Sequence, residues 1–205
     1  MFCGRNKSNH KDIVIMKITL RSRLAPVLLC LGVLTAGNMT IPAAEPPQPG
    51  AAAPDFTLNT LDARAITLSA ETARQPVVLV VLRGWPGYQC PLCTKQVQDF
   101  VQKAKSFTGQ ARVIMVYPGP AENLKAHAEQ FLKDQQWPHD FLFLTDPDYA
   151  FTQAYGLRWD APAETAYPST FVIDTKGMVK FAMTSKSHGG RATAAEVLAA
   201  LGKIK

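Results

Sequence analysis

Two cysteines three residues apart are the side chains of this sequence best suited to covalent chemistry. Cys90 and Cys93 enclose a Pro-Leu pair and follow a loop rich in glycine and proline, residues 83–87. Thiols at this spacing can alternate between a dithiol and a disulfide with little backbone movement, since residues three apart lie on one face of a helix. The motif therefore predicts redox chemistry on a disulfide or a peroxide.

The segments around the motif predict how the cysteines are held. Val77 to Leu82 is an unbroken apolar run, typical of a strand buried on both faces. After the motif, apolar residues recur at helical spacing, at Val97, Phe100, Val101, Ala104 and Phe107. Cys90 then stands just ahead of a helix, with Pro91 in its first turn. Because the positive end of the helix dipole favours a thiolate, we interpret Cys90 as the nucleophile and Cys93 as the thiol that resolves it into a redox-active disulfide.

Two other interpretations of the cysteine pair are open. A Cys-x-x-Cys motif can be half of a zinc site, but structural zinc takes four ligands and the sequence has no second such pair. His127 and His188 could complete a site, although they share no spacing typical of one. A purely structural disulfide would close a loop too short to add much stability. These points favour redox chemistry.

Length and composition are those of one ordinary globular domain. The chain has 205 residues, of which 47% are hydrophobic and 19% are charged. Its net charge of +6 is concentrated in residues 1–44, which hold six basic side chains and one acidic one, whereas the remainder holds 16 and 15. The basic balance belongs to the N-terminal segment and gives no support for nucleic-acid binding.

The N-terminal segment has the pattern of an export signal. A positive region precedes an apolar run of eleven residues, 24–34, which is short for a bilayer span. The positive side chains are Lys17, Arg21 and Arg23. Small residues at 42–44 provide a cleavage region. The signal peptide is therefore placed at 16–44, and residues 1–15 are interpreted as an upstream extension or a wrongly assigned start.

Export has a consequence for the thiols. Cys3 and Cys30 lie in the leader and would leave with it, so the mature chain keeps Cys90 and Cys93. An exported protein with one such pair has a redox-capable motif and no disulfide framework. We expect a periplasmic or extracellular protein with no stable membrane insertion after cleavage, an uncleaved signal anchor being the alternative.

The chain after the leader predicts one α/β domain, placed at residues 54–205. Residues 45–53 form a Pro/Ala segment that is expected to be an extended, mobile linker. The predicted order is a two-stranded hairpin, a short helix, alternating strands and helices, and finally two strands and a helix. The alternation gives parallel strands, and the last hairpin, turning at 175–177, adds antiparallel ones. The fold class is a central mixed β-sheet flanked by helices.

Several segments together resemble the thioredoxin-like superfamily. They are the strand, loop and Cys-x-x-Cys unit at 77–93 and Tyr-Pro-Ser-Thr-Phe-Val-Ile-Asp-Thr-Lys-Gly at 167–177. The opening Ala-Pro-Asp-Phe-Thr-Leu at 53–58 is similar to that of the peroxiredoxin branch, the alkyl hydroperoxide reductase and thiol-specific antioxidant group. The resemblance covers residues 54–203. It implies a thioredoxin-like fold with a peroxiredoxin-type N-terminal hairpin.

The resemblance assigns a role to Pro168. In the superfamily a proline at this place forms a cis bond and packs against the disulfide, which implies a cis bond between Tyr167 and Pro168, with the Tyr167 backbone offered to a substrate strand. Peroxiredoxins, however, carry an arginine just ahead of this strand and a threonine or serine three residues before the reactive cysteine. In this sequence Pro168 stands at the place of the arginine, and Gly87 stands three residues before Cys90. The family also has a proline seven residues before the reactive cysteine, whereas Pro86 lies four residues before Cys90.

Other residues could supply the missing cation or assist the thiols. Arg191 follows two glycines and resembles the family's arginine ahead of its last helix, and Arg83 precedes the cysteine loop. His188 is a candidate proton shuttle. Trp85 lies in the loop and is expected to shield the motif from water. Each of these residues has an alternative role in surface pairing or packing.

The sequence thus predicts an exported thiol–disulfide oxidoreductase that resembles a peroxiredoxin, with a peroxide or a protein disulfide as its substrate. Cys90 attacks, Cys93 resolves, and a separate thiol donor, thioredoxin-like or a membrane reductase, restores the pair. This chemistry requires no organic cofactor and no metal. The alternative of another class is a metal-handling module that binds copper(I) through Cys90, Cys93 and His188 without turnover.

Overall fold

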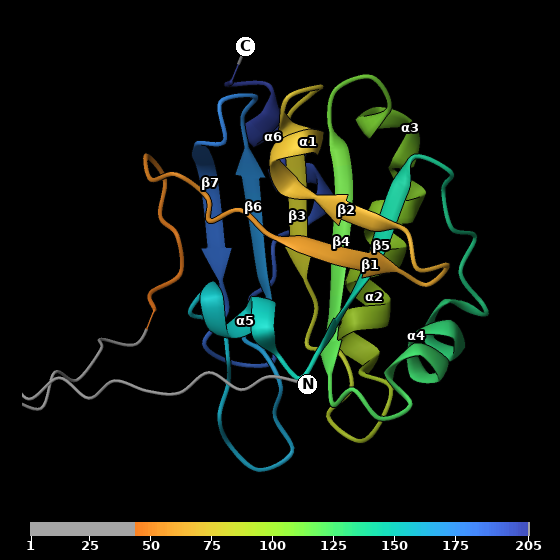
Figure 1. Cartoon of the computed structure of the whole chain (residues 1–205). Coiled ribbons are helices and arrows are strands. Elements are labelled where there is room, and N and C mark those ends of the chain that lie inside the picture. Colours follow the sequence, from red (N-terminus) through yellow and green to blue (C-terminus); the bar gives the residue numbers. More distant parts are fainter. Residues whose placement is uncertain (1–43, 205) are drawn as a thin grey trace, which may run out of the picture. The chain divides into compact units, whose positions relative to one another are not determined.

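A seven-stranded mixed sheet forms the centre of the domain (Figure 1). The computed structural model describes residues 44–204. The strands are β1 (Thr57–Thr60), β2 (Ala65–Thr67), β3 (Val77–Val81), β4 (Arg112–Gly119), β5 (Phe141–Pro147), β6 (Ser169–Ile173) and β7 (Val179–Thr184). The helices are α1 (Leu68–Thr72), α2 (Pro91–Gln102), α3 (Ala104–Phe107), α4 (Leu124–Leu132), α5 (Ala150–Ala154) and α6 (Ala194–Leu201).

The strands lie across the sheet in the order β2-β1-β5-β4-β3-β6-β7. β3, β4 and β5 run parallel, while the hairpins β1–β2 and β6–β7 add antiparallel strands on either side. Parallel neighbours need crossover connections, which α2 with α3 provides from β3 to β4 and α4 provides from β4 to β5. The predicted element order and the mixed sheet with a parallel centre are confirmed.

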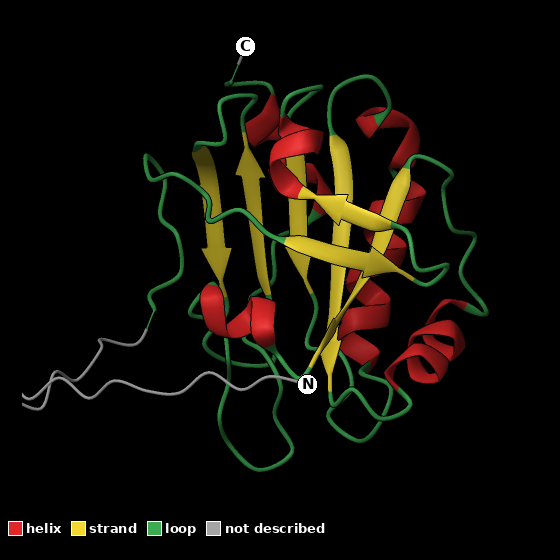
Figure 2. Cartoon of the chain, viewed as in Figure 1, coloured by secondary structure: helices red, strands yellow, loops and turns green. Residues whose placement is uncertain are grey.

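Helices cover both faces of the sheet (Figure 2). Alternate residues of β3 serve the two faces, Val78 and Val80 one of them and Val77, Leu79 and Val81 the other. The first face packs against α2, α4 and α6, and the second against α5 and the N-terminal hairpin. All five residues of β3 are fully buried, as the unbroken apolar run predicts. The helix that carries the cysteines is therefore fixed on a rigid strand.

Some elements begin or end at other residues than the sequence pattern predicts. The Pro-Gly pair at 118–119 predicts the end of β4, yet parallel pairing with β5 continues through it. α4 begins at Leu124 rather than at Ala121, because Asn123 ahead of it has a left-handed backbone with φ 57°. α5 begins one residue after Tyr149 for the same reason, since the φ of Tyr149 is 65°.

From the sequence, Ser69 is expected to cap the short helix that follows it and Thr193 the last helix. The second prediction is confirmed and the first is wrong. Thr193 caps α6: its hydroxyl accepts the N–H of Glu196 (3.2 Å), and the Glu196 carboxylate accepts the N–H of Thr193 (2.8 Å). Ser69 does not cap α1, which starts after Thr67. The Ser69 hydroxyl donates instead to the carboxylate of Asp55 (2.7 Å) and ties α1 to the start of the domain.

The segment predicted as a linker, residues 45–53, lies against the domain. Its last part, residues 50–53, forms backbone hydrogen bonds with the β6–β7 hairpin, for example from the N–H of Gly50 to the carbonyl of Val179 (2.8 Å). Two consecutive prolines within it are buried. The expectation of a free linker therefore differs from the structure, because the segment finds backbone partners in the hairpin.

The predicted leader lies outside the described residues, apart from Ala44. The signal peptide, its cleavage region and the upstream extension all fall there. Between residues 44 and 204, the structure has no helix that is both long and apolar enough to span a bilayer.

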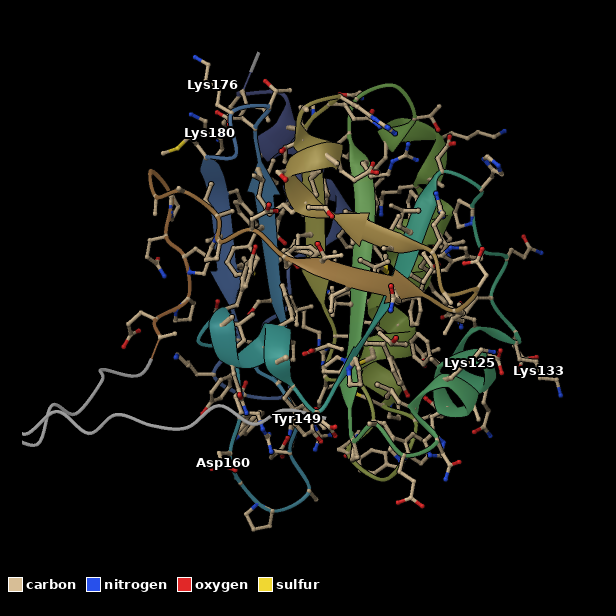
Figure 3. The ribbon with its side chains drawn as sticks, viewed as in Figure 1. Lys125, Lys133, Tyr149, Asp160, Lys176 and Lys180 are labelled. Atoms are coloured by element: carbon tan, nitrogen blue, oxygen red, sulfur yellow. The ribbon has the colours of Figure 1, made fainter. Side chains whose placement is uncertain are left out.

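Four lysines lie at the periphery of the domain (Figure 3). Lys125 and Lys133 extend from the α4 region, and Lys176 and Lys180 from the end of the β6–β7 hairpin. Lys180 pairs with Asp174 (3.1 Å), but exposed ion pairs of this kind contribute at most about 1 kcal/mol. The stability of the domain therefore rests on its two apolar layers.

Candidate active site

Cys90 and Cys93 stand at the start of α2, as predicted. Cys90 immediately precedes the helix in an extended conformation, and Pro91 is the first helical residue. Both thiols are free, and both residues are buried, with 3% of Cys90 and none of Cys93 exposed. The small accessible part of the pair therefore belongs to Cys90.

The guanidinium of Arg191 lies against both sulfur atoms. Its Nη1 is 3.4 Å from Sγ of Cys93, and its Nη2 is 3.8 Å from Sγ of Cys90. A planar guanidinium can meet two acceptors at once, which a lysine ammonium on a flexible stem does poorly. The loop between β7 and α6 thus brings the predicted cation to the thiols.

The two thiols differ in their ability to carry charge. A hydrogen bond from the Cys93 thiol, aided by the charge of Arg191, lowers the pKa of Cys90 to about 5 against the burial that would raise it. Burial raises the pKa of Cys93, and the adjacent Cys90 thiolate raises it further. Cys90 is therefore a thiolate at neutral pH, while Cys93 stays protonated and donates to it.

Neutral groups hold Arg191 in place. Its Nη1 donates to Oε1 of Gln96 (3.3 Å), and its Nε donates to the carbonyl of His188 (3.2 Å). Gln96 is itself buried, and its amide donates to the carbonyl of Ala192 (3.2 Å). Among residues 44–204, no carboxylate forms an ion pair with Arg191, so its positive charge is available to the sulfur atoms.

The loop between β3 and α2 is fixed on β4 and α4. The N–H of Trp85 donates to the carbonyl of Pro118 (2.9 Å), and its indole stacks on His127 with 3.7 Å between ring centroids. Gln89, next to the first cysteine, accepts the hydroxyl of Tyr117 (2.9 Å) and donates to the carbonyl of His127 (2.8 Å). Trp85 therefore serves to pack the loop, and His127 is a packing residue rather than a ligand.

Gly84 allows this loop to approach β4. Its φ is +73°, and a Cβ there would overlap the carbonyl oxygen of Pro118. We expect Gly84→Ala to lower the free energy of unfolding by about 3 kcal/mol, because left-handed strain and overlap add. Gly109→Ala is the matched control, since Gly109 has the same φ and open space around it, and its expected cost is about 1 kcal/mol. Urea unfolding measures both losses, and equal losses would contradict the steric argument.

Arg83 and His188 meet at Glu164. Arg83 Nε lies 2.7 Å from one carboxylate oxygen and His188 Nε2 lies 2.8 Å from the other. Burial lowers the pKa of Arg83, but hydrogen bonds to Tyr88 and Glu164 outweigh it and raise that pKa above its ordinary value. The backbone of Arg83, rather than its side chain, acts on the thiols, since it lowers the pKa of Cys93. The side chains of Arg83 and His188 thus tie three loops together, and the cation at the thiols is Arg191.

The peptide bond between Tyr167 and Pro168 is trans, which corrects the expected cis bond. The N–H of Tyr167 donates to the carbonyl of Leu157 (2.8 Å), and its carbonyl accepts the hydroxyl of Ser169 (2.9 Å). These bonds hold the chain extended as it enters β6, where the ordinary trans geometry fits. Since both backbone groups of Tyr167 have partners within the chain, its expected role in holding a substrate strand is not supported.

Three residues of the site are not predicted from the sequence, namely Gln89, Gln96 and Glu164. Gln96 has a recognisable signal, because a glutamine between Cys93 and Val97 interrupts the apolar face of a helix. Gln89 and Glu164 lie in irregular loops, where spacing carries no information about contacts. The partner of each is distant in sequence, so only the folded chain identifies them.

The copper-handling alternative lacks support in this geometry. Its third ligand, His188, binds the carboxylate of Glu164. Within the described part of the chain, no three His, Cys, Asp or Glu side chains are grouped as a metal site would need. The site instead combines two thiols with a guanidinium.

The mixed sheet, the helix-borne thiol and the arginine from the last loop define a thioredoxin-like fold of the peroxiredoxin type. The structure is similar to the peroxidoxin BcpB of Mycobacterium tuberculosis, with a TM-score of 0.61 and 25% identity over 78% of this chain and 99% of that one. It is also similar in fold to a peroxiredoxin-like protein of Aquifex aeolicus, with a TM-score of 0.66 and 15% identity over 80% and 91% of the two chains.

The redoxin family model matches residues 48–201, and the chain belongs to this family. It is 30% identical over 139 residues to alkyl hydroperoxide reductase E of Mycobacterium tuberculosis, covering 65% of this chain and 82% of that protein. It is also 30% identical over 132 residues to the chloroplastic peroxiredoxin Q of Oryza sativa subsp. japonica. That match covers 64% of this chain and only 57% of the rice protein.

Proposed function

We propose that this chain is a thiol-dependent peroxidase in which Cys90 attacks the peroxide and Cys93 resolves the product. The observation that carries the proposal is the guanidinium of Arg191 against both sulfur atoms, beside a thiol whose pKa is about 5. The names of the relatives, a peroxiredoxin and an alkyl hydroperoxide reductase, support the same activity. Arg191 takes the place of the cation that Pro168 cannot supply.

The proposed reaction has two steps. The Cys90 thiolate attacks the terminal oxygen of the peroxide, an S–O bond forms, the O–O bond breaks, and the leaving alkoxide or hydroxide takes up a proton from water. Cys90 is then a sulfenic acid. The sulfur of Cys93 attacks the sulfur of Cys90, the S–O bond breaks, and hydroxide leaves as water with the proton of Cys93. The product is the Cys90–Cys93 disulfide.

The environment of Cys93 suits it to the second step. Burial and the charge of Cys90 raise the pKa of the Cys93 thiol, while Arg191 lowers it. Oxidation of Cys90 to the sulfenic acid removes the negative charge that raises the pKa of Cys93. The arginine that lowers this pKa stays in place. Cys93 therefore becomes more acidic once it has a sulfur atom to attack, which orders the two steps.

Stopped-flow fluorescence tests the proposal. Every sample is the full chain carrying Cys3→Ser and Cys30→Ser, so that only the motif can react. Mixed in its reduced form with hydrogen peroxide, it is expected to oxidise far faster than free cysteine, with a change in the fluorescence of Trp85, whose loop holds the motif. Oxidation at the rate of an ordinary thiol would refute the peroxidase proposal.

Protein-disulfide exchange is a second candidate, and one observation favours it. Among the described residues, the exposed large apolar side chains are Tyr88 and Leu92, each two residues from Cys90. Exposed apolar groups around a reactive atom suit contact with a protein surface. Reduction of a protein disulfide such as that of insulin, measured beside the peroxide reaction, decides between the two substrates.

We also propose export and an external thiol donor. The charge and apolar pattern of residues 16–44 support export to the periplasm or beyond. The pair Cys90 and Cys93 has no third cysteine after the leader to reduce it, so a thioredoxin-like protein, a membrane reductase or another thiol must do so. The mass of the mature chain after secretion by a bacterial host tests cleavage near residue 44, and an unchanged mass would contradict it.

A further inference from the structure

A groove of about 760 Å³ lies beside the thiols, between α2 and the segment that runs from His188 to α6. Leu92, which lies between the two cysteines, and Arg191, which contacts both sulfur atoms, form part of its wall. From Leu92 the groove follows the helix as far as Gln102, about 15 Å at the rise of an α-helix. Its volume is in the range of sites for small molecules. The groove thus borders Arg191, the side chain that contacts both sulfur atoms.

The charge along the groove is positive. Arg191 and Lys95 line it and neither has a carboxylate partner among residues 44–204. Lys103 also lines it, but it pairs with Asp99, whose second carboxylate oxygen accepts the N–H of Ala194 (2.7 Å). The acidic side chain in the wall is therefore neutralised, and an anionic ligand would meet two cations that have no carboxylate partner.

The wall carries amide side chains that suit peptide groups. Gln98 and Gln102 lie along it, and amides can both donate to and accept from peptide bonds. Leu92 is the only large apolar side chain among the described residues of the wall, so the groove is a poor site for a fatty acyl chain. A short peptide with carboxylates fits both the charge and the hydrogen-bonding groups.

We infer that this groove binds the reductant of the Cys90–Cys93 disulfide, a low-molecular-weight peptide thiol that bears carboxylates. The inference rests on the proposed redox pair and names its electron donor. A carboxylate of the ligand pairs with Lys95, and its thiol reaches Cys90, the cysteine with an accessible edge. Nη2 of Arg191, which faces Cys90 at 3.8 Å, stays available to the sulfur atom that is attacked.

The reduction balances with two equivalents of the thiol. The first thiolate attacks Sγ of Cys90, a mixed disulfide forms, and the bond to Cys93 breaks, so Cys93 leaves as a thiolate and takes up the proton that the donor released. The second thiol loses its proton to water and attacks, as the thiolate, the donor sulfur of the mixed disulfide. The donor leaves as its own disulfide and Cys90 leaves as the thiolate. Two thiols are oxidised for each protein disulfide that is reduced.

Reduced glutathione, a carboxylate-bearing peptide thiol, is the probe, and uncharged 2-mercaptoethanol is its reference. The disulfide of the full chain with Cys3→Ser and Cys30→Ser is made with diamide and then mixed with each thiol. We expect the rate with glutathione to saturate and the rate with 2-mercaptoethanol to rise linearly. In Lys95→Glu, the ratio of the two rate constants is expected to fall about ten-fold. Lys105→Glu, an exposed lysine outside the groove, is expected to keep the ratio.

The outcomes separate this inference from the peroxidase proposal. Linear rates with both thiols and an equal ratio in the two lysine variants would overturn the groove as the donor site, even if peroxide oxidises the chain rapidly. Slow oxidation by peroxide would refute the peroxidase but leave this test intact, because diamide makes the disulfide. If diamide forms no Cys90–Cys93 disulfide, the groove inference fails together with the redox pair.

Discussion

Replacing Cys90 by serine is expected to abolish rapid oxidation by hydrogen peroxide, whereas replacing Cys93 by serine is expected to leave the first oxidation intact. The loss in Cys90→Ser is on the order of 10³-fold or more, as for removal of a catalytic nucleophile. The reason is that Cys90 carries the thiolate, with a pKa of about 5, and the accessible edge, while Cys93 is fully buried. Stopped-flow mixing of each reduced variant with peroxide gives the two rates.

The two variants also differ in their products. Cys93→Ser stops at the sulfenic acid of Cys90, which dimedone traps as an adduct visible by mass, while the parent chain proceeds to the disulfide. The opposite pattern, with rapid oxidation kept in Cys90→Ser and lost in Cys93→Ser, would reverse the assigned roles. The reversed assignment is a real alternative, because the guanidinium of Arg191 is nearer to Cys93 (3.4 Å) than to Cys90 (3.8 Å).

Local patterns account for most of the fold. The apolar run from Val77 predicts a strand buried on both faces, and β3 is such a strand, with the cysteine helix following it. The alternation of strands and helices predicts the parallel centre, because crossovers leave little other choice. The errors lie at element ends. Asn123 and Tyr149 have left-handed backbones that no apolar periodicity reveals.

The site is less accessible to sequence reasoning than the fold. The pair Cys90 and Cys93 lies within one helical turn, so its geometry is local and its spacing is sufficient. The arginine at the thiols lies about 100 residues further on, and sequence alone offers both Arg191 and Arg83 as candidates. The contact that separates them is the ion pair of Arg83 with Glu164, which forms between residues 81 positions apart.

The trans bond at Pro168 shows where resemblance misleads. A family pattern predicts a cis bond there, but the hydrogen bonds of the Tyr167 backbone to Leu157 and Ser169 decide the local geometry. The same bonds occupy the groups that a substrate strand would use. The chain thus departs from the disulfide-exchange pattern at this point, although it retains the two cysteines.

Replacing Arg191 by methionine is expected to raise the pKa of Cys90 and to slow its oxidation about ten-fold or more. Reactivity of Cys90 toward iodoacetamide follows the thiolate, so in the parent chain it rises with pH through a midpoint near 5 and is level around neutral pH. The positive charge favours the thiolate, so its removal moves the midpoint upward. Cys93→Ala is expected to move it further, since the hydrogen bond from Cys93 is the largest cause that lowers this pKa.

Two further variants make the Arg191 result specific. Arg74→Met removes an exposed arginine elsewhere and is expected to leave the midpoint unchanged. Arg191→Lys keeps the charge but not the planar fork, so it is expected to restore part of the pKa shift and less of the peroxide rate. Thermal unfolding of all variants separates a folding defect from an electrostatic one. An unchanged midpoint in a folded Arg191→Met variant would show that the guanidinium does not act on the Cys90 thiolate, and the cation at the centre of the proposed mechanism would have to be sought elsewhere.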